Sequence, residues 1–500
     1  HYGLSAYKPI VLDVFNTRLR ALGKHRARLS TRTYHDTGLK LTEVKRPPDA
    51  SDTVSCLYKS LPITPTGLLA QIVDSGATVL GVSATANTPT VIHNFDHDYL
   101  KVRLQNRYRL LSHAQRKQLG EYYAGRRRYQ DAGIAINCQL IRSNQQMAAD
   151  LVEMHEGHPP RDLAFALSSL VKMNAADSYG VQWFSKLIGS MHAFVHQKHS
   201  RYMLALLNRT VEVDPDFIKT LEENLSAKAD RPVKIFVSIN AEAIKSGRFE
   251  EAKNHLSNTL DKVIVISTYP TMAEGKNPDY CVLQAADRDA LIWVGAGVRQ
   301  GECRGDIDAI YLEKPTNMLI NNSDTQINLL IMLHQIMCLL YNGTIAITEA
   351  QQWAWQLLKG LDTKINTQLY NKTIDAPEAT RRVIQQAIGR MARTAYKRQE
   401  ILVMCDSDLA TLIGTDNSHT DSLSHEYVAL RDFCKSQLVH AGETNAGAEL
   451  RQRNIALLNA QLTLSKIDEL LGGIFAGNES AIEEWQDVRL QLLREPSRDS

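Results

Sequence analysis

Two arginines near the end of the chain have the spacing of a phosphate clamp. They belong to the octet Gln-Ala-Ile-Gly-Arg-Met-Ala-Arg at 386–393, which precedes an apolar, strand-like run at 400–405. Because Arg390 and Arg393 are three residues apart, a helix would place them on one face. Two guanidinium groups on one face can hold a polyphosphate and stabilise charge during phosphoryl transfer. Gly389 would let the backbone come close to such a ligand. The alternative for the octet alone is a solvated basic helix end.

Hydroxyl side chains follow an apolar run early in the chain. Residues 77–83, Ala-Thr-Val-Leu-Gly-Val-Ser, are predicted to form a buried strand that ends in Ser83, Ala84 and Thr85. Open α/β sheets bind ligands beyond the carboxyl ends of their strands, so Ser83 and Thr85 are candidate ligand contacts. Taken alone, this segment is more simply an ordinary strand end.

A second run has the same form in the middle of the chain. The apolar stretch at 262–267 is predicted to be a strand, and it leads into Thr268 and a loop with Gly275 and Asn277. Thr268 could touch a nucleic-acid phosphate, while Gly275 and Asn277 could approach a nucleotide. An ordinary joint between a strand and a helix is the alternative.

Together and in this order, the three segments resemble motifs III, V and VI of the superfamily-2 helicases, which are ATP-driven motors on DNA or RNA. The match is to Ser-Ala-Thr at 83–85, to Thr…Gly-x-Asn at 268–277 and to Gln-x-x-Gly-Arg-x-x-Arg at 386–393. The resemblance covers the surroundings of these motifs and leaves the rest of the chain unplaced.

The resemblance implies a role for each motif residue. Arg390 and Arg393 would face the γ-phosphate of ATP across a cleft between two domains, so that hydrolysis depends on closure of the cleft. The remaining contacts to the nucleotide would come from Gly275, Asn277, Gln386 and Gly389. Contact with nucleic acid, and its coupling to the nucleotide site, would come from Ser83, Thr85 and Thr268.

The resemblance, with the alternation of apolar runs and helical stretches, also implies an α/β fold with two RecA-like helicase domains. We expect the C-terminal part of the first domain at 1–95, a helical insertion or linker at 96–230, the complete second domain at 231–415 with a helical insertion at about 325–380, and a helical C-terminal region at 416–500. The second domain should hold a mostly parallel sheet containing 233–238, 263–267, 308–313 and 400–405.

Two motifs of the family are missing from the sequence. No GxxxxGK[ST] phosphate loop occurs in the 500 residues, and no Asp-Glu pair follows an apolar strand. In the family both precede the Ser-Ala-Thr motif, and this chain begins at His1, so we expect most contacts to ATP and Mg²⁺ upstream of it or in a partner subunit. This chain alone should then be inactive. The alternative is a non-catalytic helicase-like protein that binds nucleic acid or acts as a scaffold.

Composition sets broader limits. The net charge of +2 neither requires nor excludes nucleic acid. Seven cysteines, none spaced as CxxC, indicate a reducing, cytoplasmic setting and no zinc ribbon. The most apolar run, 327–341, is too short and too polar to span a bilayer, so no membrane partner is expected. No GxGxxG follows a strand, which disfavours a Rossmann-type enzyme.

One basic and aromatic cluster falls outside the three motifs. Arg126, Arg127 and Arg128 lie beside Tyr122, Tyr123 and Tyr129. Cations mixed with stacking rings suit a single-stranded track of DNA or RNA. A solvated helix face is the alternative.

Overall fold

The structure is a computed structural model of the chain. It describes residues 34–45, 55–83, 85–86, 88–172, 178–273, 277–296, 301–316, 318–320, 325–358, 368–416 and 423–440, with positions 482, 485 and 486. Gly275 lies outside this range, as does most of the expected helical region at 416–500, which is represented chiefly by α18 (His425–His440).

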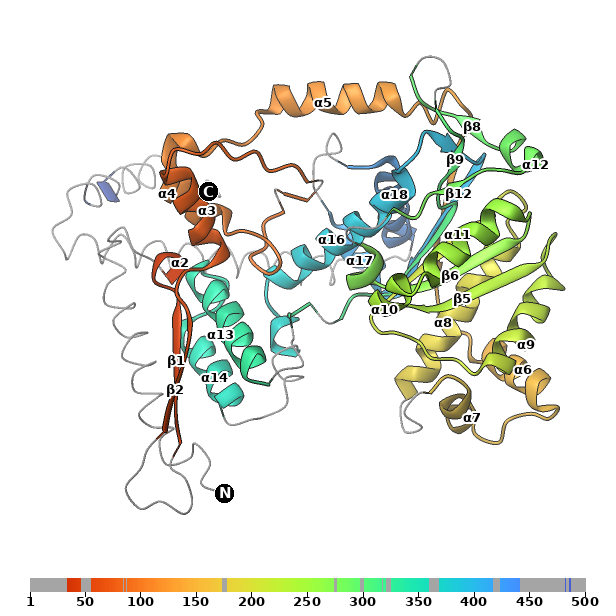
Figure 1. Cartoon of the computed structure of the whole chain (residues 1–500), viewed down its shortest axis with the longest axis horizontal. Helices are drawn as coiled ribbons and strands as arrows, with labels where there is room; N and C mark the ends of the chain where they lie inside the picture. Colours follow the sequence, from red (N-terminus) through yellow and green to blue (C-terminus); the bar gives the residue numbers. More distant parts are fainter. Residues whose placement is uncertain are drawn as a thin grey trace.

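A six-stranded, fully parallel sheet forms the centre of the larger lobe (Figure 1). Its strands in spatial order are β3 (Ala135–Ile141), β12 (Glu400–Asp406), β10 (Ala309–Leu312), β4 (Tyr202–Leu207), β6 (Lys262–Thr268) and β5 (Val233–Ile239). The predicted α/β class is therefore confirmed. All four strands expected from the apolar runs belong to this one sheet.

Helices cover both faces of the sheet, which is why every residue of β4, β6 and β10 is buried. One face packs against α6 (Gln145–Glu156), α7 (Leu163–Leu170), α8 (Ser178–Val195) and α9 (Pro215–Ser226). The other packs against α10 (Ala241–Lys245), α11 (Arg248–Asn258), α16 (Asp375–Ile388), α17 (Ala410–Gly414) and α18. Alternate residues of each strand point to opposite faces, so Leu204 and Leu206 lie in one core and Met203 and Ala205 in the other.

Buried ion pairs tie together the amino-terminal ends of the central strands. Asp287, from α12 (Ala285–Asp289), pairs with Arg398 and lies 2.5 Å from Arg201 Nη1. Arg398 Nε also lies 3.0 Å from Asp308. Although burial raises the pKa of Asp287, the two arginines hold it below its ordinary value. Removing one member would leave a buried charge without compensation, so the network fixes how β4, β10 and β12 begin.

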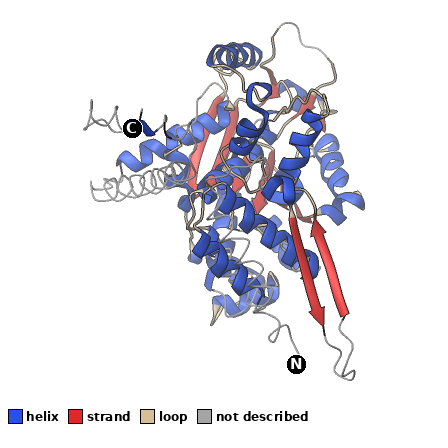
Figure 2. Cartoon of the chain, turned by 90° about the vertical axis from the view of Figure 1, so that its left-hand side faces the viewer, coloured by secondary structure: helices blue, strands red, loops and turns tan. Residues whose placement is uncertain are grey.

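A second lobe gathers segments from both halves of the sequence. It contains α2 (Tyr34–Thr37), the antiparallel hairpin of β1 (Leu39–Lys45) and β2 (Ser55–Leu61), α3 (Pro65–Asp74), α4 (His97–Leu104), α13 (Thr325–Tyr341) and α14 (Ile347–Leu358). Figure 2 shows the hairpin projecting from the body. Tyr34, Leu39, Val91 and Ile92 share one core with α13 and α14. The segment after the first motif is thus packed against the helices that follow β10.

Two strands of the sheet come from the range expected to be a helical insertion. Both β3 and β4 lie within 96–230, so the sheet begins about a hundred residues earlier than the expected boundary at 231. The described part of 1–95 contributes the hairpin and no strand of the large sheet.

The prediction of a strand at 77–83 is wrong. These residues form neither a helix nor a strand, and Val79, Leu80 and Val82 are 47%, 85% and 86% exposed. A strand needs a neighbour for its backbone N–H and C=O groups, and no described residue pairs with this segment.

Candidate functional site

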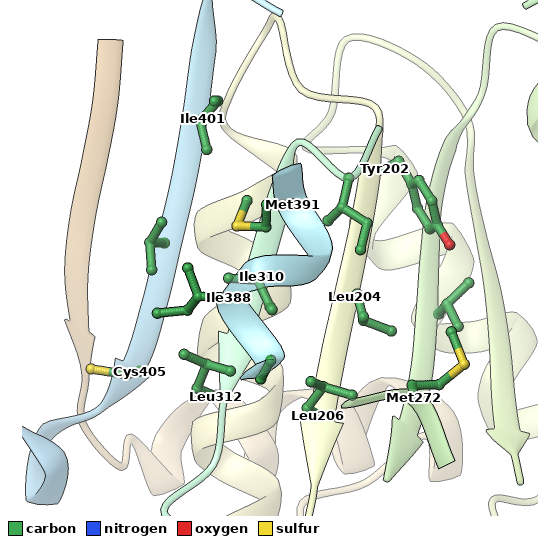
Figure 3. Close-up of a cluster of buried hydrophobic side chains, with 14 of the residues drawn as sticks. Tyr202, Leu204, Leu206, Met272, Ile310, Leu312, Ile388, Met391, Ile401 and Cys405 are labelled. Atoms are coloured by element: carbon green, nitrogen blue, oxygen red, sulfur yellow. The ribbon is translucent and has the colours of Figure 1, made fainter. Parts of the chain in front are cut away.

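Helix α16 carries the arginine octet and is held firmly on the sheet. Its buried Ile384, Ala387 and Ile388 belong to the core over β4, β10 and β12. Figure 3 shows Ile388 and Met391 above Ile310 and Leu312 of β10 and Leu204 and Leu206 of β4. Because Met391 is completely buried, the turn that follows α16 cannot move without disturbing this core.

The two arginines of the octet differ in exposure. The α-helix gives way at Gly389 to a 3₁₀ turn, η4 (Gly389–Ala392). Arg390 is 5% exposed, whereas the side chain of Arg393 is exposed. The expected pair on one face is therefore one buried and one accessible guanidinium. Arg393 is the one that a ligand outside the lobe can reach.

Asp306 holds the backbone around Arg393. Its Oδ2 accepts hydrogen bonds from the N–H groups of Arg393 at 2.7 Å and Thr394 at 2.9 Å, and from Lys397 Nζ at 2.5 Å. Lys397 also donates to the carbonyl of Met391. The Asp306 and Lys397 side chains are each 1% exposed. A buried ion pair of this kind holds the backbone at Arg393 in place, because moving either partner would leave a buried charge without compensation.

Thr85 and Gln386 meet, which joins the first and third motifs. Gln386 Nε2 donates a 2.8 Å hydrogen bond to Thr85 Oγ1 across 301 positions. Thr85 is 2% exposed, and its backbone N–H donates to Ser83 Oγ at 3.3 Å. Ser83 itself is exposed. The small hydroxyl residues thus form a local turn that presents Thr85 to α16.

A second contact ties the same segment to the start of α16. Asp375 accepts hydrogen bonds from Thr90 Oγ1 at 2.8 Å, from the Val91 N–H at 2.9 Å and from Tyr370 Oη at 2.7 Å. Burial raises the pKa of Asp375 above its ordinary value, and these hydrogen bonds limit the rise. The chain after the first motif is therefore attached to α16 twice. Thr85 contacts the last turn of the helix, and Thr90 and Val91 contact its first residue.

The second motif begins at the carboxyl edge of the sheet. Thr268 ends β6, and its Oγ1 lies 2.9 Å from Thr271 Oγ1 in a π-helical turn, η3 (Tyr269–Ala273). Tyr269 Oη donates to the carbonyl of Glu313 at 2.5 Å. Gly275 lies outside the described residues. Asn277 is exposed.

Asn277 leads toward the turn that carries Arg393. It precedes β7 (Tyr280–Cys281), which pairs with β9 (Arg304–Gly305), and Arg304 Nε lies 2.5 Å from Asp279. β9 is followed at once by Asp306 and contacts β11 (Tyr396–Lys397). The end of the second motif and the accessible arginine of the third therefore belong to one connected region.

Thr268 lies at the carboxyl ends of the parallel strands, whereas Arg393 lies at their amino ends. Thr268 is the last residue of β6, whereas Arg393 is bound by Asp306, just before β10 begins. Arg393, an expected nucleotide contact, thus lies at the amino ends of the strands, and Thr268, the expected nucleic-acid contact, lies at their carboxyl ends.

Gly389 has free space beside it. A Cβ placed on Gly389 would meet no heavy atom within 4 Å, and its backbone has an ordinary right-handed φ of −57°. Glycine is therefore not required for the turn itself, and the opening leaves room for a ligand close to the backbone.

Two further acidic side chains lie at the carboxyl edge. Glu313 accepts from the Asn208 N–H at 2.7 Å and from Tyr179 Oη at 3.2 Å. Asp406 accepts from Tyr311 Oη at 2.8 Å and from the Lys314 N–H at 3.0 Å. Burial raises the pKa of Glu313. Because both carboxylates are occupied by the protein's own donors, they hold the edge together rather than present a reactive pair.

Asp306, Lys397 and Asp375 were not predicted as site residues. Each acts through a partner far away in the sequence and belongs to no recognisable motif. The only local signal is the position of Asp306, which stands in Gly-Asp-Ile-Asp just before an apolar strand.

Within the ranges that the structure describes, no group of three or more His, Cys, Asp or Glu side chains is arranged to hold a metal ion. No described helix is long and apolar enough to cross a membrane. No protein-family model matches the chain, and a search of curated proteins finds no similar sequence.

Proposed function

We propose that this chain is part of an ATP-dependent helicase or translocase of the superfamily-2 type, built on RecA-like domains and acting on DNA or RNA in the cytoplasm. The observation that carries the proposal is the 2.8 Å hydrogen bond from Gln386 to Thr85. The resemblance implies that Thr85 couples the nucleotide site to nucleic acid and that Gln386 lies beside the nucleotide. A direct contact between these two residues, 301 positions apart, supports such a coupling.

The separation of the remaining motif residues supports the same proposal. Arg393 lies at the amino ends of the strands, and Thr268 lies at their carboxyl ends. A motor must sense nucleotide at one place and hold its track at another. A rigid sheet between the two places transmits movement between them.

Arg393 is the candidate arginine finger. Its backbone is fixed by Asp306 while its guanidinium is exposed, which suits a group that meets a phosphate only when a second domain closes. When bound, ATP with Mg²⁺ would supply the phosphoryl group whose transfer drives the motor. Arg393, Gln386 and Asn277 are the described residues available to contact it, with Gly389 providing space. Arg390, being buried, supports the turn.

The test compares the natural full-length protein with its Arg393→Ala variant, measuring ATP hydrolysis with and without single-stranded DNA or RNA. We expect stimulated hydrolysis to fall by a factor on the order of 10³ because an arginine finger stabilises the transition state. Nucleotide binding should change little. Lys219→Gln, an exposed cation on α9, is the matched control. Undiminished hydrolysis by Arg393→Ala, or no hydrolysis by the wild type, would contradict the proposal.

A further inference from the structure

Helix α5 (His113–Arg126) crosses between the two lobes as an exposed rod (Figure 1). Among residues 114–125, only Arg116 and Gly120 are half-buried, and the others are exposed. A helix in a globular protein normally buries an apolar stripe. This one instead leaves Leu119, Tyr122 and Tyr123 exposed at 44%, 53% and 56%.

Such a helix is poorly stabilised by its own sequence. Fourteen residues is close to the length at which isolated helices are marginal in water. Gly120, in the middle of the helix, costs about 0.5–1 kcal/mol relative to alanine. A capping box of Ser112 and Gln115 holds only the first turn. An additional binding partner would supply the stabilisation that the helix lacks.

The charge of this segment identifies the chemistry of that partner. Residues 109–128, the helix with its flanks, contain six lysines and arginines and one acidic residue, Glu121, so they carry +5. The whole chain carries +2, which leaves −3 for all the rest. A local concentration of positive charge on a nearly neutral protein is complementary to a polyanion. An acidic protein surface would match the charge but not the adjacent rings.

The two tyrosines add a feature that favours bases over other anions. Tyr122 and Tyr123 have ring centroids 6.0 Å apart at an interplanar angle of 74°, with cations at Arg116 and Lys117 nearby on the same helix. Aromatic rings beside cations bind single-stranded nucleic acid, because bases stack on the rings while phosphates meet the charges.

Both ends of α5 are attached to the body of the molecule. Before the helix, Arg107 Nη2 pairs with Asp74 of α3 at 2.6 Å. After it, the Arg128 N–H donates to the Val294 carbonyl at 3.1 Å, and Arg127 donates to the carbonyl of Ala392, directly before Arg393. A ligand on α5 would therefore act on the same turn that presents Arg393.

We propose that α5 and its flanks, residues 109–128, bind single-stranded nucleic acid through Tyr122 and Tyr123 and through the cations around them, and that Arg127 connects this surface to the Arg393 turn. The inference rests on the proposed function, since it assigns a second part of the track that the motor holds.

The test measures binding of the 500-residue chain to fluorescein-labelled oligothymidine and oligouridine strands of roughly 30 nucleotides, longer than one binding unit covers. Fluorescence anisotropy at several salt concentrations gives both Kd and its salt dependence. Tyr122→Ala/Tyr123→Ala should raise Kd by about tenfold or more because stacking is lost. Arg109→Gln/Lys117→Gln should reduce the slope of log affinity against log salt by about 1.4, the value for two phosphate contacts on a single strand.

The matched controls are Phe165→Ala, an exposed ring on α7, and Lys219→Gln on α9. Both should bind as the wild type does. Hydrogen exchange gives an independent measurement, because amides at 113–126 should become protected when the strand is added. Comparing thymidine with uridine strands shows whether DNA or RNA is preferred.

The outcomes separate the two proposals. Normal binding by both α5 variants, with no added protection at 113–126, would overturn the inference while leaving the motor function intact. No binding of either strand by the wild type would overturn both. Loss of binding in the α5 variants, together with loss of stimulation by the strand in the full-length protein, would support the inference.

Discussion

Thr85 Oγ1 accepts a hydrogen bond from Gln386 Nε2 at 2.8 Å, in a setting where Thr85 is almost completely buried. Hydroxyl and amide side chains can exchange partners easily, since each both donates and accepts. The contact is therefore suited to being made in one nucleotide state and broken in another.

Thr85→Val should separate this role from packing. Valine has the same shape but no hydroxyl, so Gln386 loses its acceptor at a cost of about 1–3 kcal/mol. We expect a lower midpoint in urea denaturation and weaker stimulation of ATP hydrolysis by nucleic acid. Thr85→Ser, which keeps the hydroxyl, should retain the stimulation. Equal stimulation in Thr85→Val and wild type would show that the contact is purely structural.

Asp306→Asn should destabilise the larger lobe. Lys397 would keep its charge in a buried position without a carboxylate, a loss of about 3–5 kcal/mol. Denaturant unfolding of the wild type and of Asp306→Asn measures the difference in the free energy of unfolding. The double variant Asp306→Asn/Lys397→Met removes the stranded charge and should be more stable than Asp306→Asn alone. If the double variant were the less stable one, the pair would not act as described.

Thr268→Ala should weaken the response to nucleic acid and leave basal hydrolysis unchanged, because its hydroxyl is expected to touch a backbone phosphate. The measurement is the strand concentration that gives half-maximal stimulation of the full-length protein. Thr271→Ala removes the neighbouring hydroxyl, which lies 2.9 Å from Thr268, and serves as the control for local packing. An equal loss in both variants would assign the effect to the turn instead of to Thr268.

Acid should loosen the smaller lobe through His334. Burial, with a smaller contribution from His35, lowers the pKa of His334 to about 4 from its ordinary value of 6.5. The unfolded chain binds this proton near pH 6.5 and the folded chain only near pH 4, so stability falls as pH falls through this window. Below pH 4 the loss in the free energy of unfolding reaches about 3 kcal/mol.

Trp353 lies in the same core as α13 and provides a fluorescence signal for this transition. The His334→Gln variant should lose the His334 part of the acid sensitivity between pH 6.5 and 4. His158→Gln, at an exposed position, should follow the wild type. Identical pH profiles for wild type and His334→Gln would exclude His334 as the cause.

The parts of the sheet that could be predicted are those with continuous apolar runs bounded by turns. β5, β6, β10 and β12 have this form, since strands buried on both faces need apolar residues throughout. β3 alternates exposed residues, including Asn137 and Gln139, with half-buried ones, which is a pattern typical of a strand. It was missed because the helical stretches on both sides led to the whole of 96–230 being interpreted as helical. β4 was missed because Tyr-Met-Leu-Ala-Leu-Leu follows an apolar helix, and a short apolar run does not distinguish a strand from a buried helix.

The site was predictable only where a motif spans neighbouring residues. The octet with Gln386 and Arg393 was found in this way, whereas the side chains that hold it in place were not. Asp306 and Lys397 are 91 positions apart, and no local pattern announces their pairing. The exposed segment at 79–82 shows the opposite error, a strand predicted where none forms. Apolar composition favours a strand, but forming one also requires a neighbour, which a run of residues cannot specify.

Helix α16 belongs to two cores. Ala376 and Ala379 pack in the smaller lobe, Ile384 and Ile388 pack on the sheet, and Val383 borders both. The boundary between the lobes therefore runs across the middle of a continuous helix and not through a linker. A recombinant fragment limited to the sheet would leave Ala376 and Ala379 of α16 uncovered and would be prone to aggregate. Expression of either lobe should succeed only when the other is present, supplied in the same chain or added as a separate piece.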